Sequence, residues 1–165
     1  IGFLNRVSGI AGIAKISEKN MAALGSTLMT MGAAEEEAGT AVSAIFTRLA
    51  SAPDKAPVRD ALKAIGMDAK AVQQGMAVDA QATIMTIVDA VKALPEAEQI
   101  SVLGEMVGTE HVKTMAKMVS GTEEWRRQIE LANSSEALGT TVWSNFAKKT
   151  RSRLRISEVF MWRGP

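Results

Sequence analysis

The residue types that could do chemistry are few in this sequence, and the first candidate is a single histidine. His111 is the only histidine among the 165 residues, and there is no cysteine. Its neighbour Glu110 could pair with it in acid–base chemistry, but no nucleophile or third polar group converges on the two. We therefore interpret His111 as a surface or half-buried histidine. Without cysteine, disulfides and cysteine-ligated metals are excluded, and no second or third metal ligand occurs at helical spacing.

The second candidate is the carboxylate triplet Glu35, Glu36 and Glu37. It could be read as a metal site or as acid–base carboxylates. Consecutive residues of a helix point about 100° apart, however, so the three cannot converge on one site. Three acids in a first turn instead complement the positive end of the helix dipole, and we interpret the triplet as a helix start. The glycines form no phosphate-binding pattern. The sequence thus predicts no catalytic residue, no cofactor, no metal and no enzyme.

A basic C-terminal end is the best candidate for contact with a charged partner. From Lys148 onward there are six basic residues and one acid, a balance of +5, whereas residues 1–147 carry 13 basic and 17 acidic residues, a balance of −4. The run KKTRSRLR could touch nucleic acid or an acidic surface such as the lumen of a tube. We favour a solvated helix end or tail, which is the commoner role of such runs. A frame change or cloning scar after Thr150 is a third interpretation.

Tryptophan adds a second type of interaction candidate. Trp125 lies at helical spacing from Ile129 and is predicted to be a core residue. Trp143 could be core as well, or it could lie at a partner interface, where tryptophan is enriched. The candidate interaction residues are therefore Trp143, Lys148, Lys149, Arg151, Arg153 and Arg155.

The elements that must position these residues are helices. Hydrophobic residues make up 47% of the chain and aromatics only 4%, with much alanine and methionine and no segment that alternates with period 2. This predicts an all-α fold, a compact bundle or array of about eight short helices with short loops and no sheet. Expected starts are Ser17, Glu35, Pro57, Asp68, Asp79, Pro95, Thr109, Thr122 and Ser134 or Ser135; expected stops are Gly32, Pro53, Gly66, Gly75, Gly108 and Gly121.

Two glycines inside neighbouring helices predict close packing. Gly25 precedes the stop at Gly32, and Gly39 follows the acidic start. An interior glycine costs helix stability, so its gain is expected to be a close helix–helix approach. We expect the two helices to form a tight αα-hairpin joined at Gly32. The stripe Ala38, Ala41, Val42, Ile45 and Leu49 predicts the buried face of the second one.

The chain divides into three predicted parts. Residues 1–16 form an N-terminal helical segment, which we interpret as the start of a fragment because the chain begins at Ile1 rather than at methionine. Residues 17–147 form a helical module, and residues 148–165 form a basic tail. No apolar run approaches the ~18 residues that a membrane span needs, and the N-terminus does not resemble a secretory signal.

Several segments in order carry a family resemblance. They are GAAEEEAGTAVSAIFTRL (Gly32 to Leu49), ALKAIGMDA (Ala61 to Ala69), the stretch from Gly75 to Val112, and GTTVWSNFAKKT (Gly139 to Thr150). This ordered set, over residues 20–147, resembles the compact N-terminal region of bacteriophage tail tape measure proteins. The end RSRLRISEVFMWRGP departs from the family, in which more helix would be expected.

The resemblance implies a structural role in a phage or prophage tail. A tape measure protein occupies the tail tube during assembly, sets tail length and leaves ahead of the DNA. Implied partners are tube and tip proteins, assembly chaperones and further copies of itself, with no small-molecule substrate; the implied location is the inside of the tail tube, and the host cytoplasm during assembly. The many predicted helix breaks indicate a folded module rather than the extended ruler. The alternative is a helical nucleic-acid-associated or general protein-interaction domain that uses the basic end.

Overall fold

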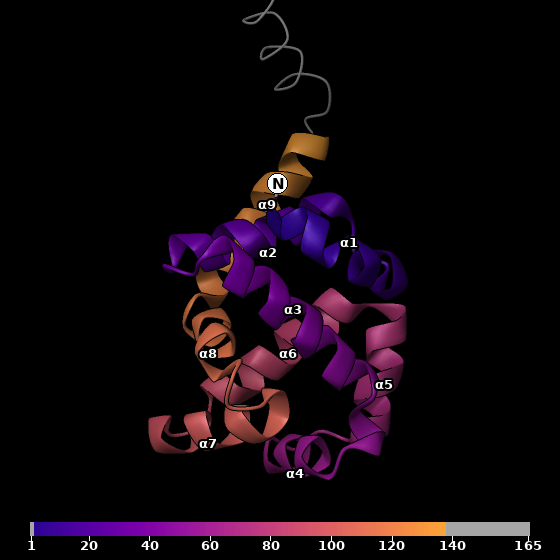
Figure 1. The fold of residues 1–165 in the computed structure, drawn as a ribbon, viewed down its shortest axis with the longest axis vertical. Coiled ribbons are helices and arrows are strands. Elements are labelled where there is room, and N and C mark those ends of the chain that lie inside the picture. Colours follow the sequence, from indigo (N-terminus) through magenta and orange to yellow (C-terminus); the bar gives the residue numbers. More distant parts are fainter. Residues whose placement is uncertain (1, 138–165) are drawn as a thin grey trace, which may run out of the picture. The chain divides into compact units, whose positions relative to one another are not determined.

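The computed structural model describes residues 2–137, and within them it confirms the all-α fold class: there are nine α-helices, one short 3₁₀-helix and no strand. In chain order the helices are α1 (Gly2–Ala14), α2 (Glu18–Thr30), α3 (Glu35–Ala50), η1 (Ala52–Asp54), α4 (Ala56–Ala64), α5 (Ala69–Val78), α6 (Ala80–Lys92), α7 (Glu96–Val107), α8 (Val112–Ser120) and α9 (Thr122–Ala137) (Figure 1). None of these helices is long and apolar enough to span a membrane.

The chain falls into two compact units, Ile1–Ile129 and Glu130–Pro165. The first unit contains α1 to α8 and the first half of α9. Of the second unit the structure describes only the end of α9. The predicted division after residues 16 and 147 stays a prediction.

Most predicted helix starts and stops are confirmed by their hydrogen bonds and backbone angles. The side chain of Ser17 accepts a bond from the Asn20 amide at 3.1 Å, and Asp79 accepts one from Ala82 at 3.0 Å. Asp68 caps α5 in the same way. The stops at Gly32, Gly66 and Gly108 have φ angles of 88°, 75° and 84°. These left-handed angles explain why glycine closes each of these helices.

Three predicted boundaries are wrong, each for a physical reason, and Thr122 begins a helix as predicted but does not cap it. Gly75 does not end α5, because it lies inside the helix against the Thr83 side chain of α6. Thr109 caps no helix, since a turn carries the chain from Gly108 to His111 and α8 begins at Val112. Thr122 is the first residue of α9; its hydroxyl donates to carbonyl oxygens of α8. Ser134 and Ser135 lie within α9, where no glycine or proline interrupts the helix after Thr122.

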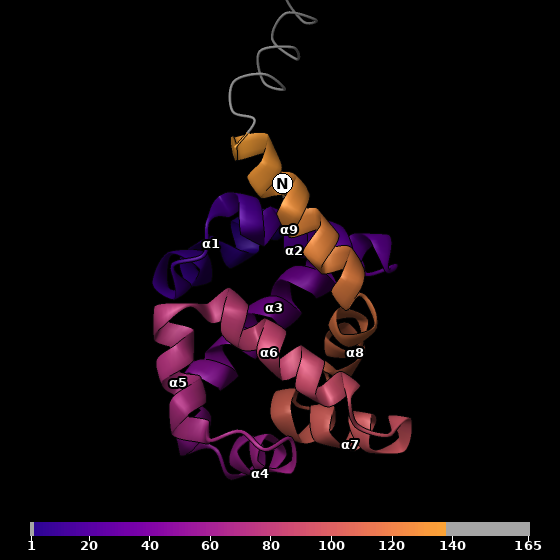
Figure 2. The ribbon, with the colours of Figure 1, turned by 180° about the vertical axis from the view of Figure 1, so that it is seen from behind.

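Helix α3 forms the centre of the first unit. It packs against α1, α2, α5, α7 and α8. It crosses the middle of the ribbon in both views, with α6 behind it in Figure 1 and in front of it in Figure 2. The predicted stripe from Ala38 to Leu49 is confirmed, since all five of its residues are buried with exposed fractions of at most 1%. A helix buried around much of its circumference positions every neighbour that contacts it.

The two interior glycines of α2 and α3 allow α1 to approach closely, rather than allowing α2 and α3 to approach each other. A Cβ on Gly25 would lie 2.6 Å from the Phe3 ring, and one on Gly39 would lie 2.9 Å from the Arg6 side chain. Helices α2 and α3 do pack on each other, but the close approach predicted between them is instead the approach of α1 to both. The N-terminal helix is thereby part of the core, with Phe3 and Val7 buried.

Candidate functional site

The histidine predicted to be chemically weak is half-buried, as expected. His111 Nε2 lies 3.9 Å from Glu110 Oε2, and the Glu110 side chain is 83% exposed. The two residues sit in the turn before α8. Among the described residues, no three histidine, aspartate or glutamate side chains are grouped so that they could hold a metal ion. The pair thus has neither the third group nor the enclosure that acid–base catalysis uses.

The acidic triplet begins α3, as predicted, and two of its members also fasten α1. The Phe3 amide of α1 donates to Glu35 Oε1 at 3.0 Å, and Arg6 pairs with Glu36 at 2.8 Å. The bond from the Phe3 amide lowers the pKa of Glu35 below its usual value. A single carboxylate therefore serves two helix N-termini. Sequence reasoning missed both contacts with α1. Phe3 and Glu35 are 32 residues apart and Arg6 and Glu36 are 30 apart, so no local spacing relates them.

The other predicted interaction residues have different outcomes. Trp125 is confirmed as a core residue, with 1% of its surface exposed. Trp143, Lys148, Lys149, Arg151, Arg153 and Arg155 lie outside the described residues, so their role in partner binding stays a prediction.

An apolar groove lies between α1, α3 and α5 of the first unit. Its volume is about 740 Å³. Side chains of all three helices line it, among them Ile10, Ile13, Ala14, Phe46, Ala50 and Met76. On each helix the lining residues are three or four positions apart, so each helix contributes one stripe. Ile13 lies at the groove and is 80% exposed, which is unusual for an isoleucine.

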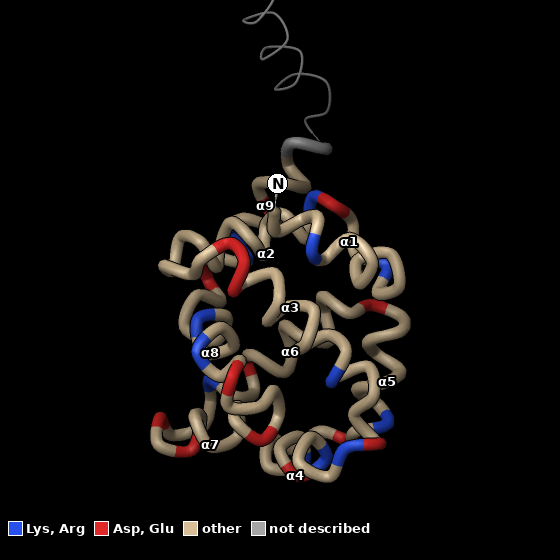
Figure 3. Tube along the Cα trace, in the orientation of Figure 1, with Lys and Arg blue, Asp and Glu red and all other residues tan. Residues whose placement is uncertain are grey.

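Charge is sparse around this groove. Between its acidic start and Arg48, α3 carries no charged residue, and the only charged residues of α1 and α5 are Arg6 and Lys70. Figure 3 shows the long stretch of α3 without charge that follows its acidic start. The one charged lining residue is Lys15, whose φ of 56° turns the chain out of α1. A hollowed face of this kind, apolar apart from Lys15, can bury an apolar partner surface.

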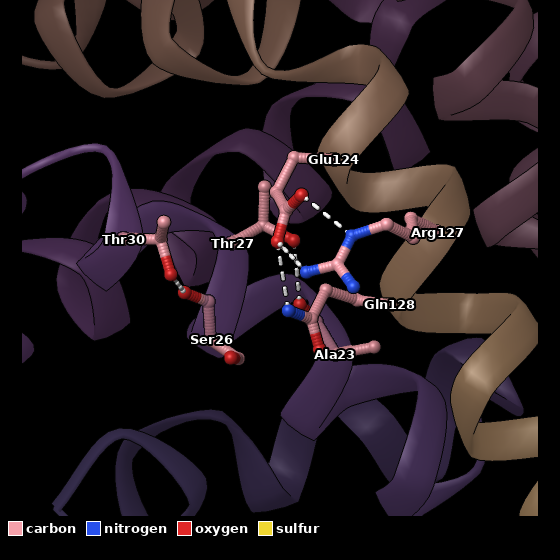
Figure 4. Close-up of polar contacts among 7 residues, drawn as sticks. All are labelled: Ala23, Ser26, Thr27, Thr30, Glu124, Arg127 and Gln128. Atoms are coloured by element: carbon pink, nitrogen blue, oxygen red, sulfur yellow. Dashed lines mark hydrogen bonds and ion pairs between the residues drawn. The ribbon is translucent and has the colours of Figure 1, made fainter.

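A polar cluster on α9 is a structural feature rather than a site. Arg127 donates to the Glu124 carboxylate through two bonds of 2.9 and 2.8 Å, and Gln128 donates to it at 2.9 Å. Figure 4 shows the three side chains pointing toward one another, in one view with the Thr27 hydroxyl bond of α2. The Arg127 and Gln128 bonds lower the pKa of Glu124 to about 2. These bonds lie within α9, whereas a further ion pair joins Arg126 to Asp89 of α6 and so ties the start of α9 to another helix of the first unit.

Comparison with known proteins gives one match. A family model described as phage-related minor tail protein matches residues 1–108. The matched residues include α1 to α7 and thus every helix that lines the groove. Neither the curated proteins nor the solved structures include a match to this chain.

Proposed function

The chain belongs to the family of phage-related minor tail proteins, and from this premise we propose that it is a folded module of a tail tape measure protein, with a role in tail assembly and tail length. The observation that carries the proposal is the family match over 108 of the 165 residues. Membership of this family makes the chain a structural phage tail protein. The finer assignment draws on the ordered segments that resemble tape measure proteins, three of which begin before residue 108.

The helix lengths support a module that works through contacts. The longest described helices, α3 and α9, have 16 residues each, which corresponds to about 24 Å of helix. Glycines with left-handed angles end α2, α4 and α7 and turn the chain back onto the core. A chain folded in this way presents surfaces to other proteins instead of extending along a tube.

The partners in this proposal are other tail proteins. Tube and tip proteins, assembly chaperones and further copies of the chain would contact it, inside the tail tube of the virion and, during assembly, in the host cytoplasm. No small-molecule substrate, cofactor or enzymatic activity belongs to the proposed role.

Genetic removal of the unit in the encoding phage or prophage tests the proposal. We expect an in-frame deletion of residues 2–129 to abolish tails or to yield tubes of irregular length in electron micrographs. The Val78→Asp variant, altered at an exposed side chain, is the matched control and should give tails of normal length. Normal tails after the deletion, with an unchanged length distribution, would refute the proposal.

A further inference from the structure

We propose that the groove between α1, α3 and α5 binds an amphipathic helix of a partner protein that places an acidic side chain opposite Lys15. The inference rests on the proposed function only in taking the module to work through protein contacts. It names the chemistry of one such partner.

The geometry of the lining favours a helix as the occupant. Ile10, Ile13 and Ala14 of α1 are spaced three and one apart along one face, and Phe46 and Ala50 of α3 are one turn apart. Stripes of this spacing form the ridges and grooves into which the side chains of another helix fit. Helix α5 has ten residues, about 15 Å, so a partner helix of about three turns would match its length. The described residues include no strand, and hence no sheet edge to which an extended peptide could add.

The exposure of one large apolar lining residue indicates that the groove can bind a partner. Ile13 is 80% exposed although it faces a hollow lined by other apolar side chains. Covering a side chain of this type removes apolar surface from water and so stabilises the complex. Met76, at the base of the groove, is 4% exposed and already belongs to the core. The groove therefore has a buried apolar floor and an exposed apolar side chain at its edge, as in other helix-binding grooves.

Charge specifies the partner further. Lys15 is exposed, and no acidic side chain of the described residues forms an ion pair with it. On α5 the only charged residue is Lys70, one turn before the lining residue Gln73, so this helix also brings positive rather than negative charge to the groove. An acidic residue on the incoming helix would complement this field. A second copy that docked groove to groove would instead bring another Lys15 to the same surface, where like charges oppose each other. A partner with an acidic apolar helix is thus favoured over self-association.

A peptide-display selection on the intact 165-residue chain tests the inference. The probe is a library of helix-forming peptides of about 14 residues, randomised on all faces, and selected peptides are then measured by fluorescence anisotropy. We expect the selected peptides to carry apolar residues at positions i, i+3 or i+4 and i+7, with a glutamate or aspartate beside this stripe.

Matched variants locate the binding. Ile13→Asp should weaken binding roughly tenfold or more, because it removes one apolar anchor. Val78→Asp places the same charge on a side chain that is also 80% exposed but does not line the groove, and it should leave binding unchanged. Lys15→Glu should weaken acidic peptides by about 1.5- to 5-fold and strengthen the same peptides when their acid is replaced by lysine.

Three results would overturn the inference. They are an absence of selected peptides, equal effects of Ile13→Asp and Val78→Asp, and acidic peptides that do not respond to Lys15→Glu. An Ile13-dependent dimer in light scattering would assign the groove to a second copy instead. Because the assay reads the groove alone, failure here with defective tails in the deletion phage would leave the proposed function intact.

Discussion

The close approach of α1 to α2 at Gly25 leads to a prediction with an unusual sign. Replacing a glycine inside a helix with alanine ordinarily stabilises a protein by up to about 1 kcal/mol, because alanine restricts the unfolded chain and favours the helix. At Gly25 the added Cβ would lie 2.6, 2.7 and 3.1 Å from three carbons of the Phe3 ring. We therefore expect Gly25→Ala to destabilise the protein.

The expected magnitude follows from the burial of Phe3. This ring is only 2% exposed, so the added methyl group must displace a buried side chain or the helix that carries it. Overpacking of a well-packed core costs about 1–3 kcal/mol. Gly12 of α1 provides the matched control, since a Cβ there meets nothing within 4 Å. Gly12→Ala should stabilise by about 0.5–1 kcal/mol, and the two variants should differ in free energy of unfolding by about 1.5–4 kcal/mol.

Urea unfolding followed by circular dichroism measures both variants under the same conditions. A double-mutant cycle with Phe3→Leu isolates the contact: the smaller side chain should reduce the cost of Gly25→Ala, whereas the effect of Gly12→Ala should be unchanged. If Gly25→Ala stabilised the protein as much as Gly12→Ala does, α1 would not lie against α2 at this glycine and the reasoning would fail.

Three further predictions concern polar groups. The folded-state pKa of Glu124 is lowered from 4.5 to about 2. The stability that this carboxylate contributes is therefore present at neutral pH and is lost as pH falls from about 4.5 toward 2. Across this range the melting temperature should depend less steeply on pH for Glu124→Gln than for the native chain. Arg48 Nε donates to the Met106 carbonyl at 3.2 Å, and Arg48→Met should cost about 1.5–3 kcal/mol in urea unfolding, since a charge-assisted bond is lost; a change below 0.5 kcal/mol would contradict it. Asp79→Ala should cost about 1 kcal/mol through loss of its cap, whereas Thr109→Ala, which caps no helix, should stay within about 0.5 kcal/mol; equal losses in calorimetry would show that the cap assignment is wrong.

Local signals in the sequence predicted much of the fold. Ser17, Asp68 and Asp79 each begin a helix because a side-chain oxygen two or three bonds from Cα reaches an amide that the helix leaves unpaired. Gly32 and Gly108 end helices because only glycine adopts their left-handed angles without strain. Such rules depend on a few adjacent residues and can be read without knowledge of the fold. They fail for the predicted caps Thr109 and Thr122. A turn separates Thr109 from the start of α8, and the Thr122 hydroxyl donates to carbonyl oxygens of α8 instead of accepting from an amide of α9.

The candidate site was less predictable because it depends on which helices meet. Ile13 belongs to a glycine-rich segment that the sequence marks only as a weak helix, and nothing local shows that it faces α3 and α5. The carboxylate of Glu35 was correctly placed at a helix start, but its bond to Phe3 spans 32 positions. Sequence periodicity shows which face of a helix is apolar. It does not show which neighbour covers that face or where the cover is incomplete.

The dimensions of the first unit bear on how a tape measure module could act. As one continuous helix, the 129 residues of Ile1–Ile129 would extend roughly 190 Å. Folded compactly, a domain of this size has a radius of gyration of only about 14 Å. Folding therefore removes most of the length that these residues could contribute along a tube, and it creates in exchange the buried face of α3 and the groove beside it. Under the proposed function, selection on this region therefore acts on its contacts with other tail proteins rather than on the distance that these residues span. Changes such as Ile13→Asp should then alter whether tails form without shifting the length of those that do.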